Sequence, residues 1–274
     1  MCLLLVVFVF LLALPAHAGQ VLNDSFVAKP LSHHLWQEVL SQHVTTEGEV
    51  DFTGLRAHPR RLNQYLDQLA RFSPDSHPDY FPSYHAKLAY WLNAHNAIAL
   101  RLILNAYPVA SLDQIPGLYQ NPRYYLGGKS YSLWAIRDRL AREFFLRPQA
   151  FFALSVMSES SPRLSSQAYS VEKTVLDKQL EAMAREFLSS PDHVVVIEPK
   201  PGECAAVELD PLIKQFERPI KRFVRAGQGV LSGESPSILD FIKRYIQPDA
   251  HGFLFENCGH PISYTKPDNR LRRI

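Results

Sequence analysis

The feature that most constrains this sequence is one long apolar stretch near its middle, Lys87–Pro108. Its apolar residues fall on every side of the helix that their spacing predicts, and such a helix is buried on all sides. Two amides, Asn93 and Asn96, interrupt the stretch. A buried amide without hydrogen-bond partners costs about 1–3 kcal/mol. These two side chains therefore either brace the core or line a binding site.

Shorter periodic segments surround this stretch. Helical spacing predicts further helices over residues 31–44, 55–72, 133–145, 171–188, 209–223 and 238–245. The apolar run Phe151–Met157 has the length of a buried strand, and His193–Ile197 is typical of a strand. Two more short strands, Gly252–Glu256 and Pro261–Tyr264, would form a hairpin. The pattern predicts an α+β fold, a predominantly helical single domain over residues 19–274 around a small, mainly antiparallel sheet.

The amino terminus has the pattern of a secretory signal peptide over residues 1–18. An apolar run fills residues 2–15, and Ala16–Ala18 is a small-x-small cleavage site. The run is too short to span a bilayer comfortably. One feature of a signal peptide is missing, because no Lys or Arg precedes the apolar run. We expect cleavage after Ala18 and a secreted or periplasmic mature chain without a transmembrane segment. The alternatives are an uncleaved anchor and a wrongly assigned start.

Two cysteines, Cys204 and Cys258, would remain in the mature chain. An oxidising compartment would allow them to form a disulfide. Because the loop between them is long, the chain-entropy account gives such a bond on the order of 4 kcal/mol. Two separate buried thiols are the alternative.

Composition and charge exclude several classes of function. The hydrophobic content of 46% and the charged content of 20% are those of an ordinary globular protein. The formal net charge is only +2, and the basic residues are scattered apart from Arg270–Arg273, so we expect no nucleic-acid partner. The 11 histidines are dispersed without the spacing of metal ligands. We therefore expect no metal ion and no other cofactor.

Several motifs occur in an order that has a known counterpart. The central stretch contains Leu88-Ala-Tyr-Trp-Leu-Asn-Ala-His-Asn-Ala97 and ends at Tyr107-Pro-Val-Ala-Ser111. Further matching segments are Val44–Phe52, Gly128, Ser132-Leu133, Ile136, Phe152-Ala-Leu154 and Ser160-Ser-Pro162. Together they resemble the domain-of-unknown-function 547 family, in its bacterial secreted branch. The resemblance runs from about residue 31 to about residue 271, with its core at about 80–190. It implies a shape and a secreted setting, but no established reaction.

The chain departs from the family pattern at residues that could carry chemistry. Arg137 stands where the family has Glu, Phe151 where it has His, and Val156 where it has Cys. His95 replaces a Tyr, and Ser155 replaces an Asn. Phe151 cannot take a proton and Val156 is not a nucleophile. The resemblance therefore implies a retained fold more firmly than retained chemistry.

Two functional hypotheses follow. The first is a non-catalytic ligand-binding or envelope-associated domain. Its ligand would be a small molecule, a peptide or a saccharide, bound near Asn93, Asn96, Ser155 and Ser160. Tyrosines in the loop after the central helix would form an aromatic wall beside it. The structural alternative is that the two amides only tie the helix to the Phe151 segment or to that loop.

The second hypothesis is a serine-type hydrolase. Ser160 or Ser161 would be the nucleophile, with His95 as the base and Asp268 orienting it. The sequence has no Gly-x-Ser-x-Gly elbow, which would mark such a nucleophile more specifically. A fluorophosphonate probe that labels the protein through these serines would favour the hydrolase. The sequence predicts neither the substrate nor the oligomeric state.

Overall fold

The computed structural model describes residues 30–121, 123–227, 236–246, 252–255 and 258–274. The predicted signal peptide, residues 1–18, lies outside them. The helices are α1 (His34–His43), α2 (Phe52–Ala57), α3 (Arg60–Arg71), α4 (Tyr84–Ala106), α5 (Leu133–Glu143), α6 (Lys173–Ser189), α7 (Pro211–Gln215), α8 (Glu217–Ala226) and α9 (Leu239–Ile242). Short 3-10 turns cover Pro78–Tyr80, Leu112–Gln114, Pro148–Ala153 and Gly252–Phe255. None of these described helices is both long and apolar enough to cross a membrane.

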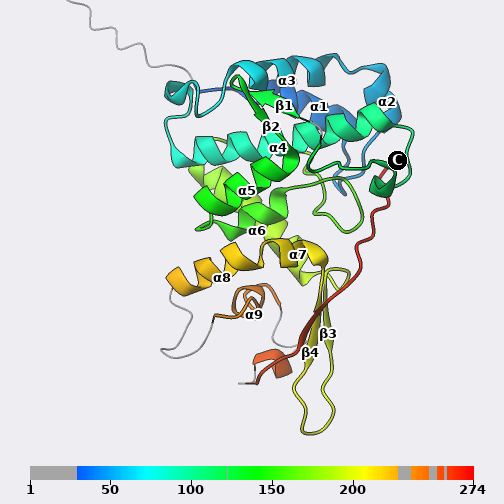
Figure 1. The fold of residues 1–274 in the computed structure, drawn as a ribbon, viewed down its shortest axis with the longest axis vertical. Helices are drawn as coiled ribbons and strands as arrows, with labels where there is room; N and C mark the ends of the chain where they lie inside the picture. Colours follow the sequence, from blue (N-terminus) through cyan, green and yellow to red (C-terminus); the bar gives the residue numbers. More distant parts are fainter. Residues whose placement is uncertain (1–29, 122, 228–235, 247–251, 256–257) are drawn as a thin grey trace, which may run out of the picture.

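The predicted central helix is α4, and every residue from Leu88 to Leu100 in it is buried. It begins at Ser83, whose Oγ accepts a hydrogen bond from the Ala86 N–H at 3.0 Å. It ends just before Pro108, because proline cannot continue the hydrogen-bond ladder. Helices α1–α3 lie on one side of α4, and α5 and α6 lie on the other (Figure 1). This sandwich explains why α4 is apolar all round.

The Phe151–Met157 segment is buried as predicted, but the prediction of a strand is wrong. Its first half belongs to the 3-10 turn Pro148–Ala153, and its second half is irregular. The turn packs against α5, α6 and α8, so it is enclosed on several sides. Enclosure gives a continuous apolar run whether the backbone is extended or helical. Pro148, at the start of the turn, suits a helical opening.

Two small sheets complete the fold. Strands β1 (Tyr124–Leu126) and β2 (Lys129–Tyr131) form an antiparallel pair near α3. The second sheet has the order β3 (Val194–Ile197), β4 (Ala206–Leu209), β5 (Ile262–Tyr264). Strand β4 is antiparallel to β3 and parallel to β5. The predominantly helical α+β class with mainly antiparallel sheets is therefore confirmed.

The carboxy-terminal hairpin predicted from Gly252–Glu256 and Pro261–Tyr264 is wrong. Gly252–Phe255 forms a 3-10 turn, and β5 pairs with β4 instead. The apolar pattern identified β5 as a strand but could not identify its distant partner. Beside this sheet, the Sγ atoms of Cys204 and Cys258 lie at disulfide-bonding distance, with their Cα atoms 5.9 Å apart. The sequence left this pairing open, and the geometry is that of a disulfide.

Candidate functional site

The two amides of α4 each donate and accept a hydrogen bond with the backbone of a neighbouring segment. Asn93 donates to the Tyr169 carbonyl and accepts from the Tyr169 N–H, both at 2.9 Å. Asn96 donates to the Ala153 carbonyl at 2.9 Å and accepts from the Ser155 N–H at 3.1 Å. Both side chains are buried. This arrangement is the bracing role that the sequence left open beside ligand binding.

The serines after the 3-10 turn differ in their surroundings. Ser155 is buried, and its Oγ accepts from the Met157 N–H at 3.1 Å. Ser161 closes its own turn, donating to the Ser158 carbonyl at 3.0 Å and accepting from the Ser158 N–H at 3.1 Å. Ser160 borders a cavity described below. Of the four residues predicted to contact a ligand, Ser160 alone is among those that line the cavities described here.

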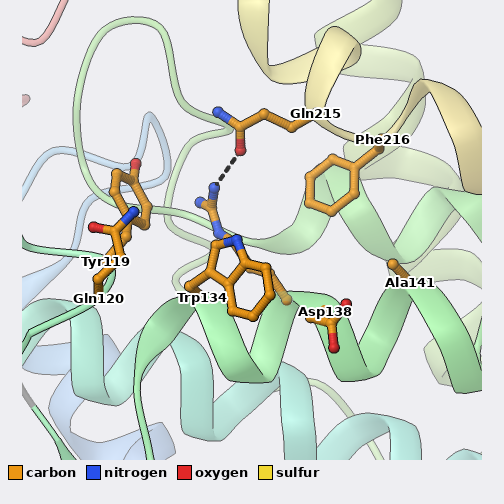
Figure 2. Close-up of a pocket in the computed structure, with 8 residues that line it drawn as sticks. Tyr119, Gln120, Trp134, Asp138, Ala141, Gln215 and Phe216 are labelled. Atoms are coloured by element: carbon orange, nitrogen blue, oxygen red, sulfur yellow. Dashed lines mark hydrogen bonds between the residues drawn. The ribbon is translucent and has the colours of Figure 1, made fainter.

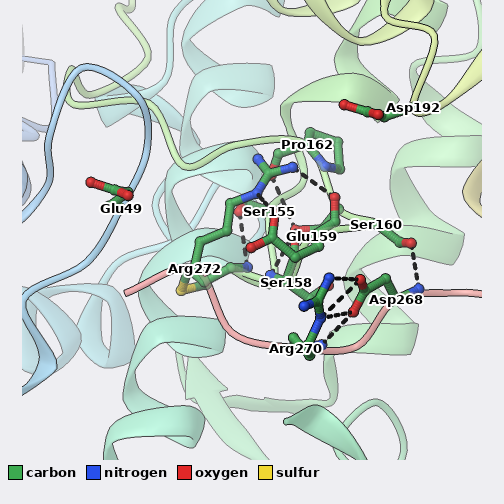
Figure 3. A network of polar contacts seen from close by, with 12 residues as sticks. Glu49, Ser155, Ser158, Glu159, Ser160, Pro162, Asp192, Asp268, Arg270 and Arg272 are labelled. Atoms are coloured by element: carbon green, nitrogen blue, oxygen red, sulfur yellow. Dashed lines mark hydrogen bonds and ion pairs between the residues drawn. The ribbon is translucent and has the colours of Figure 1, made fainter. Parts of the chain in front are cut away.

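The carboxy-terminal segment holds this serine turn in place (Figure 3). The Asp268 N–H donates to Ser160 Oγ at 2.6 Å, and Arg272 donates to the Glu159 carbonyl at 2.6 Å and to its carboxylate at 3.1 Å. The Asp268 carboxylate accepts from Arg270, at 2.5 Å for the shortest contact. Its hydrogen bonds are the main reason that its pKa is lowered. Asp268 thus pairs with Arg270 rather than orienting a histidine.

His95 is buried between Asn96 and Arg137. Its Nδ1 lies 3.0 Å from Asn96 Oδ1, and its Nε2 lies 3.1 Å from Arg137 Nε. Because the guanidinium Nε–H can only donate, Nε2 must accept, and the ring proton lies on Nδ1. Burial, and then the charge of Arg137, lower the pKa of His95 to about 3. Both ring nitrogens are engaged, so His95 is not available for the general-base role that the hydrolase alternative assigns to it.

Arg137 is a buried cation with few partners. It is 5% exposed; burial lowers its pKa, and a contact with the Tyr119 hydroxyl partly opposes that shift. Besides the contact with His95, its Nη1 donates to Gln215 Oε1 at 2.9 Å, and its guanidinium carbon lies 4.7 Å from the centre of the Tyr119 ring. Nη2 has no hydrogen-bond partner within the part of the chain that the structure describes.

The acidic residues that line the cavities beside Arg137 do not neutralise its guanidinium. Asp138 pairs with Arg142 at 2.9 Å. Asp210 caps α7, accepts from the Leu212 N–H at 2.8 Å and lies 3.2 Å from His193 Nδ1. Buried charges are normally paired, because removing an ion from water costs several kcal/mol. Among the described residues, Arg137 therefore lacks the anion that its burial calls for.

Two adjoining cavities meet at Arg137, and together we name them the Arg137 site. The first measures about 380 Å³ and lies beside α5 and the end of α7 (Figure 2). Its lining comprises Tyr119, Gln120, Trp134, Arg137, Asp138, Ala141, Gln215 and Phe216. The second measures about 210 Å³, shares Tyr119, Arg137 and Gln215 with the first, and adds Val156, the Ser158–Ser161 turn and the Asp210–Leu212 segment. The first cavity has the size of a small-molecule pocket.

The departures from the family pattern gather around this site. Arg137 borders both cavities, and Val156 borders the second. Phe151 stacks on Phe216, a wall of the first cavity, at 4.4 Å between ring centres and an angle of 4°. The sequence did not predict this convergence. One signal was available, because Arg137 lies four residues after Leu133, on the apolar face of its helix, where a cation is unexpected.

Comparison with known proteins adds one match. No curated protein and no solved structure matches the chain. Residues 81–188 match the model of a family described as "Protein of unknown function, DUF547". The matched segment contains α4, α5 and all but the last residue of α6, and hence both the bracing amides and Arg137. Over residues 81–188 the chain is therefore similar to the DUF547 family, as its motifs predicted, with no distinction of a secreted branch.

Proposed function

We propose that this protein is a non-catalytic binding protein whose ligand presents a carboxylate, or a similar small anion, to Arg137. One observation carries the proposal: a buried guanidinium at the junction of two cavities has no acidic partner and an unsatisfied Nη2 in the described residues. A guanidinium binds a carboxylate through two parallel hydrogen bonds. An anion at this point would supply the pairing that the fold omits.

The surroundings suit such a ligand. Gln215 is exposed and occupies only Nη1, so a ligand oxygen can take its place. Nη2 is covered in this structure, so a second oxygen would reach it once the Gln215 side chain has moved aside. Trp134 and Phe216 offer an apolar wall for the body of the ligand. Ser160 and Tyr119 place hydroxyl groups at the edge of the second cavity. Of the residues predicted to contact the ligand, this proposal keeps Ser160 and adds Arg137. The amides Asn93 and Asn96 would then support the surrounding backbone instead of contacting the ligand.

Binding is favoured over hydrolysis by the role of His95. Its Nε2 accepts from Arg137 Nε, which holds the guanidinium in place. A histidine in that role is a positioning residue, because its basic nitrogen is already used. The positions aligned with the family's His and Cys are Phe151 and Val156, which can support neither proton transfer nor nucleophilic attack.

We also propose that the protein acts in the periplasm or outside the cell, where it could associate with the envelope. The proposal rests on the signal-like amino terminus. The Cys204–Cys258 geometry supports it, because disulfides persist in oxidising compartments. Mass spectrometry of the exported protein should find Gly19 as its first residue. Retention of Met1 would contradict this setting.

Acetate provides the simplest test of the anion site. Its binding to the folded state should raise the unfolding free energy by RT ln(1 + [L]/Kd), which is about 2.7 kcal/mol at a hundred times Kd. The measurement compares urea unfolding in sodium acetate and in sodium chloride at equal ionic strength. Arg137→Met should abolish the difference between the two salts. Arg139→Met, on the same helix, is the matched control and should keep it.

Equal stabilisation of the wild-type protein by acetate and chloride would contradict the proposal. So would an acetate effect that survives in Arg137→Met, because the anion would then bind elsewhere.

A further inference from the structure

A strongly basic groove lies on α7 and α8, which we name the α8 groove. It measures about 670 Å³ and is lined by Lys214, Gln215, Glu217, Arg218, Lys221, Arg222 and Arg225. Five of these residues are cations and one is an acid. The chain as a whole is nearly neutral, at +2. The groove is therefore a local concentration of positive charge rather than a reflection of overall composition.

Little of that charge is neutralised by neighbouring side chains. Glu217 pairs with Lys221 at 2.6 Å and accepts from the Tyr264 hydroxyl at 3.1 Å, so its carboxylate is already engaged. Arg222 lies over the Phe145 ring, 3.7 Å from its centre, which orients the guanidinium while leaving its charge intact. Arg218 and Arg225 form no ion pair with the residues that the structure describes.

The α8 groove continues from the Arg137 site. Gln215 borders the groove and both cavities of that site. From there Arg218, Arg222 and Arg225 follow at intervals of four and three residues, which places them on one helical face. Successive cations are thus separated by about one helical turn, roughly 5 Å along the axis. A row of positive charges begins at the mouth of the Arg137 site.

We infer that the ligand is an acidic oligosaccharide, with its terminal carboxylate on Arg137 and its following carboxylates along the α8 groove. The inference rests on the proposed anion site and extends it to a class of ligand. A linear chain with one carboxylate per unit complements a row of cations one turn apart. A single small anion would leave the groove unused.

The first cavity favours a sugar over other polyanions. Trp134 is 56% exposed and borders the same cavity as Arg137. An open indole face beside a guanidinium suits a pyranose ring that carries a carboxylate, because the apolar face of the ring can stack while the acid pairs. Gln120 and Gln215 supply amides for its hydroxyl groups. An acidic peptide would satisfy the cations but has no ring to place on Trp134.

Calorimetric titration with galacturonate and its linear tetramer, at one ionic strength, tests the inference. The tetramer should bind about tenfold tighter than the monomer, the gain expected from two or three exposed ion pairs. Arg218→Gln combined with Arg225→Gln should bring the ratio of the two affinities close to one. Arg60→Gln combined with Arg71→Gln removes the same charge from exposed positions of α3 and should preserve the ratio.

The outcomes separate this inference from the proposed function. Monomer binding that needs Arg137, without any gain for the tetramer, overturns the oligosaccharide and leaves the anion site standing. Tetramer binding that survives Arg137→Met overturns both, because the groove would then act alone. A glutamate tetrapeptide that binds as tightly as the sugar tetramer overturns the sugar class. Absence of binding by either sugar also overturns the inference.

Discussion

Two arginines on α5, two residues apart, have opposite surroundings. Arg139 donates to both carboxylate oxygens of Asp75, at 2.6 and 2.7 Å, and to Glu143 at 3.1 Å. Burial alone would lower the pKa of Arg139, but its hydrogen bonds and the nearby acids raise it overall. Arg137 is more deeply buried, is paired with a neutral His95, and has a lowered pKa. Arg139 is thus neutralised by the fold itself, whereas Arg137 is the cation that we propose a ligand neutralises.

The largest expected effect is the loss of stability when Asn96 is replaced. The buried Asn96 amide is hydrogen-bonded through both its oxygen and its nitrogen, whereas Arg137 has no partner for Nη2 among the described residues. Asn96→Ala would leave the Ala153 carbonyl and the Ser155 N–H without their partner and remove a contact of His95. We expect a loss of about 3–4 kcal/mol in unfolding free energy, measured by urea denaturation. Lys87→Ala, at an exposed position of α4, is the control and should cost less than about 0.5 kcal/mol. A loss below about 1 kcal/mol in Asn96→Ala would contradict a bracing role.

The second prediction compares the two arginines directly. Arg139→Met should lower the unfolding free energy by about 2–3 kcal/mol, because it leaves the partly buried Asp75 without its main partner. Arg137→Met should change it by no more than about 1 kcal/mol, because removing an unpaired buried charge offsets the cost of leaving His95 Nε2 without its donor. Urea unfolding without added carboxylate measures both. Equal losses in the two variants would show that the distinction between these arginines is unfounded.

The smallest effect is a change in pH dependence. The folded pKa of His95, about 3, lies below its unfolded value of about 6.5. Between these values the unfolded chain binds more protons, so stability falls as pH decreases, by at most about 1.4 kcal/mol per pH unit. Buried His33, with its pKa lowered to about 4, adds a similar trend. Arg137→Met removes one cause of the low His95 pKa and should make the slope shallower.

Arg139→Met is again the control, and its slope should match that of the wild-type protein. The comparison needs unfolding free energies measured between about pH 5 and pH 3, because folded His95 takes up its proton only near its lowered pKa. An unchanged slope in Arg137→Met would mean that the charge of Arg137 does not act on His95.

The sequence predicted the fold class and the central helix because periodicity and burial are local signals. Pro108 identified the carboxy-terminal end of α4, since proline acts on the adjacent backbone. The predictions from sequence were wrong where secondary structure or strand pairing depended on residues far away in the chain. Phe151–Met157 has the same apolar run that a strand would show, and β5 pairs with β4 from more than fifty residues away. Enclosure and strand pairing are tertiary facts that a local pattern does not contain.

The candidate site was predictable only in part. The family resemblance singled out Arg137, Phe151 and Val156 as departures. Taken one at a time, each departure indicated only that a residue able to take part in a reaction had been replaced. Their shared location, and the absence of a described acid beside Arg137, emerged only from the packing of α5 against α7 and the serine turn. The amides Asn93 and Asn96 were conspicuous in the sequence, yet their partners are backbone groups that no motif specifies.

The most direct measurement of the central claim follows the arginine side-chain N–H signals by proton–nitrogen NMR during a titration with acetate at constant ionic strength. Arg137→Met and Arg139→Met assign the two sets of signals. If Arg137 binds the anion, its signals shift and saturate while those of Arg139, already paired with Asp75, stay in place. Arg137 signals that do not move, or that move no more than those of Arg139, would contradict the account.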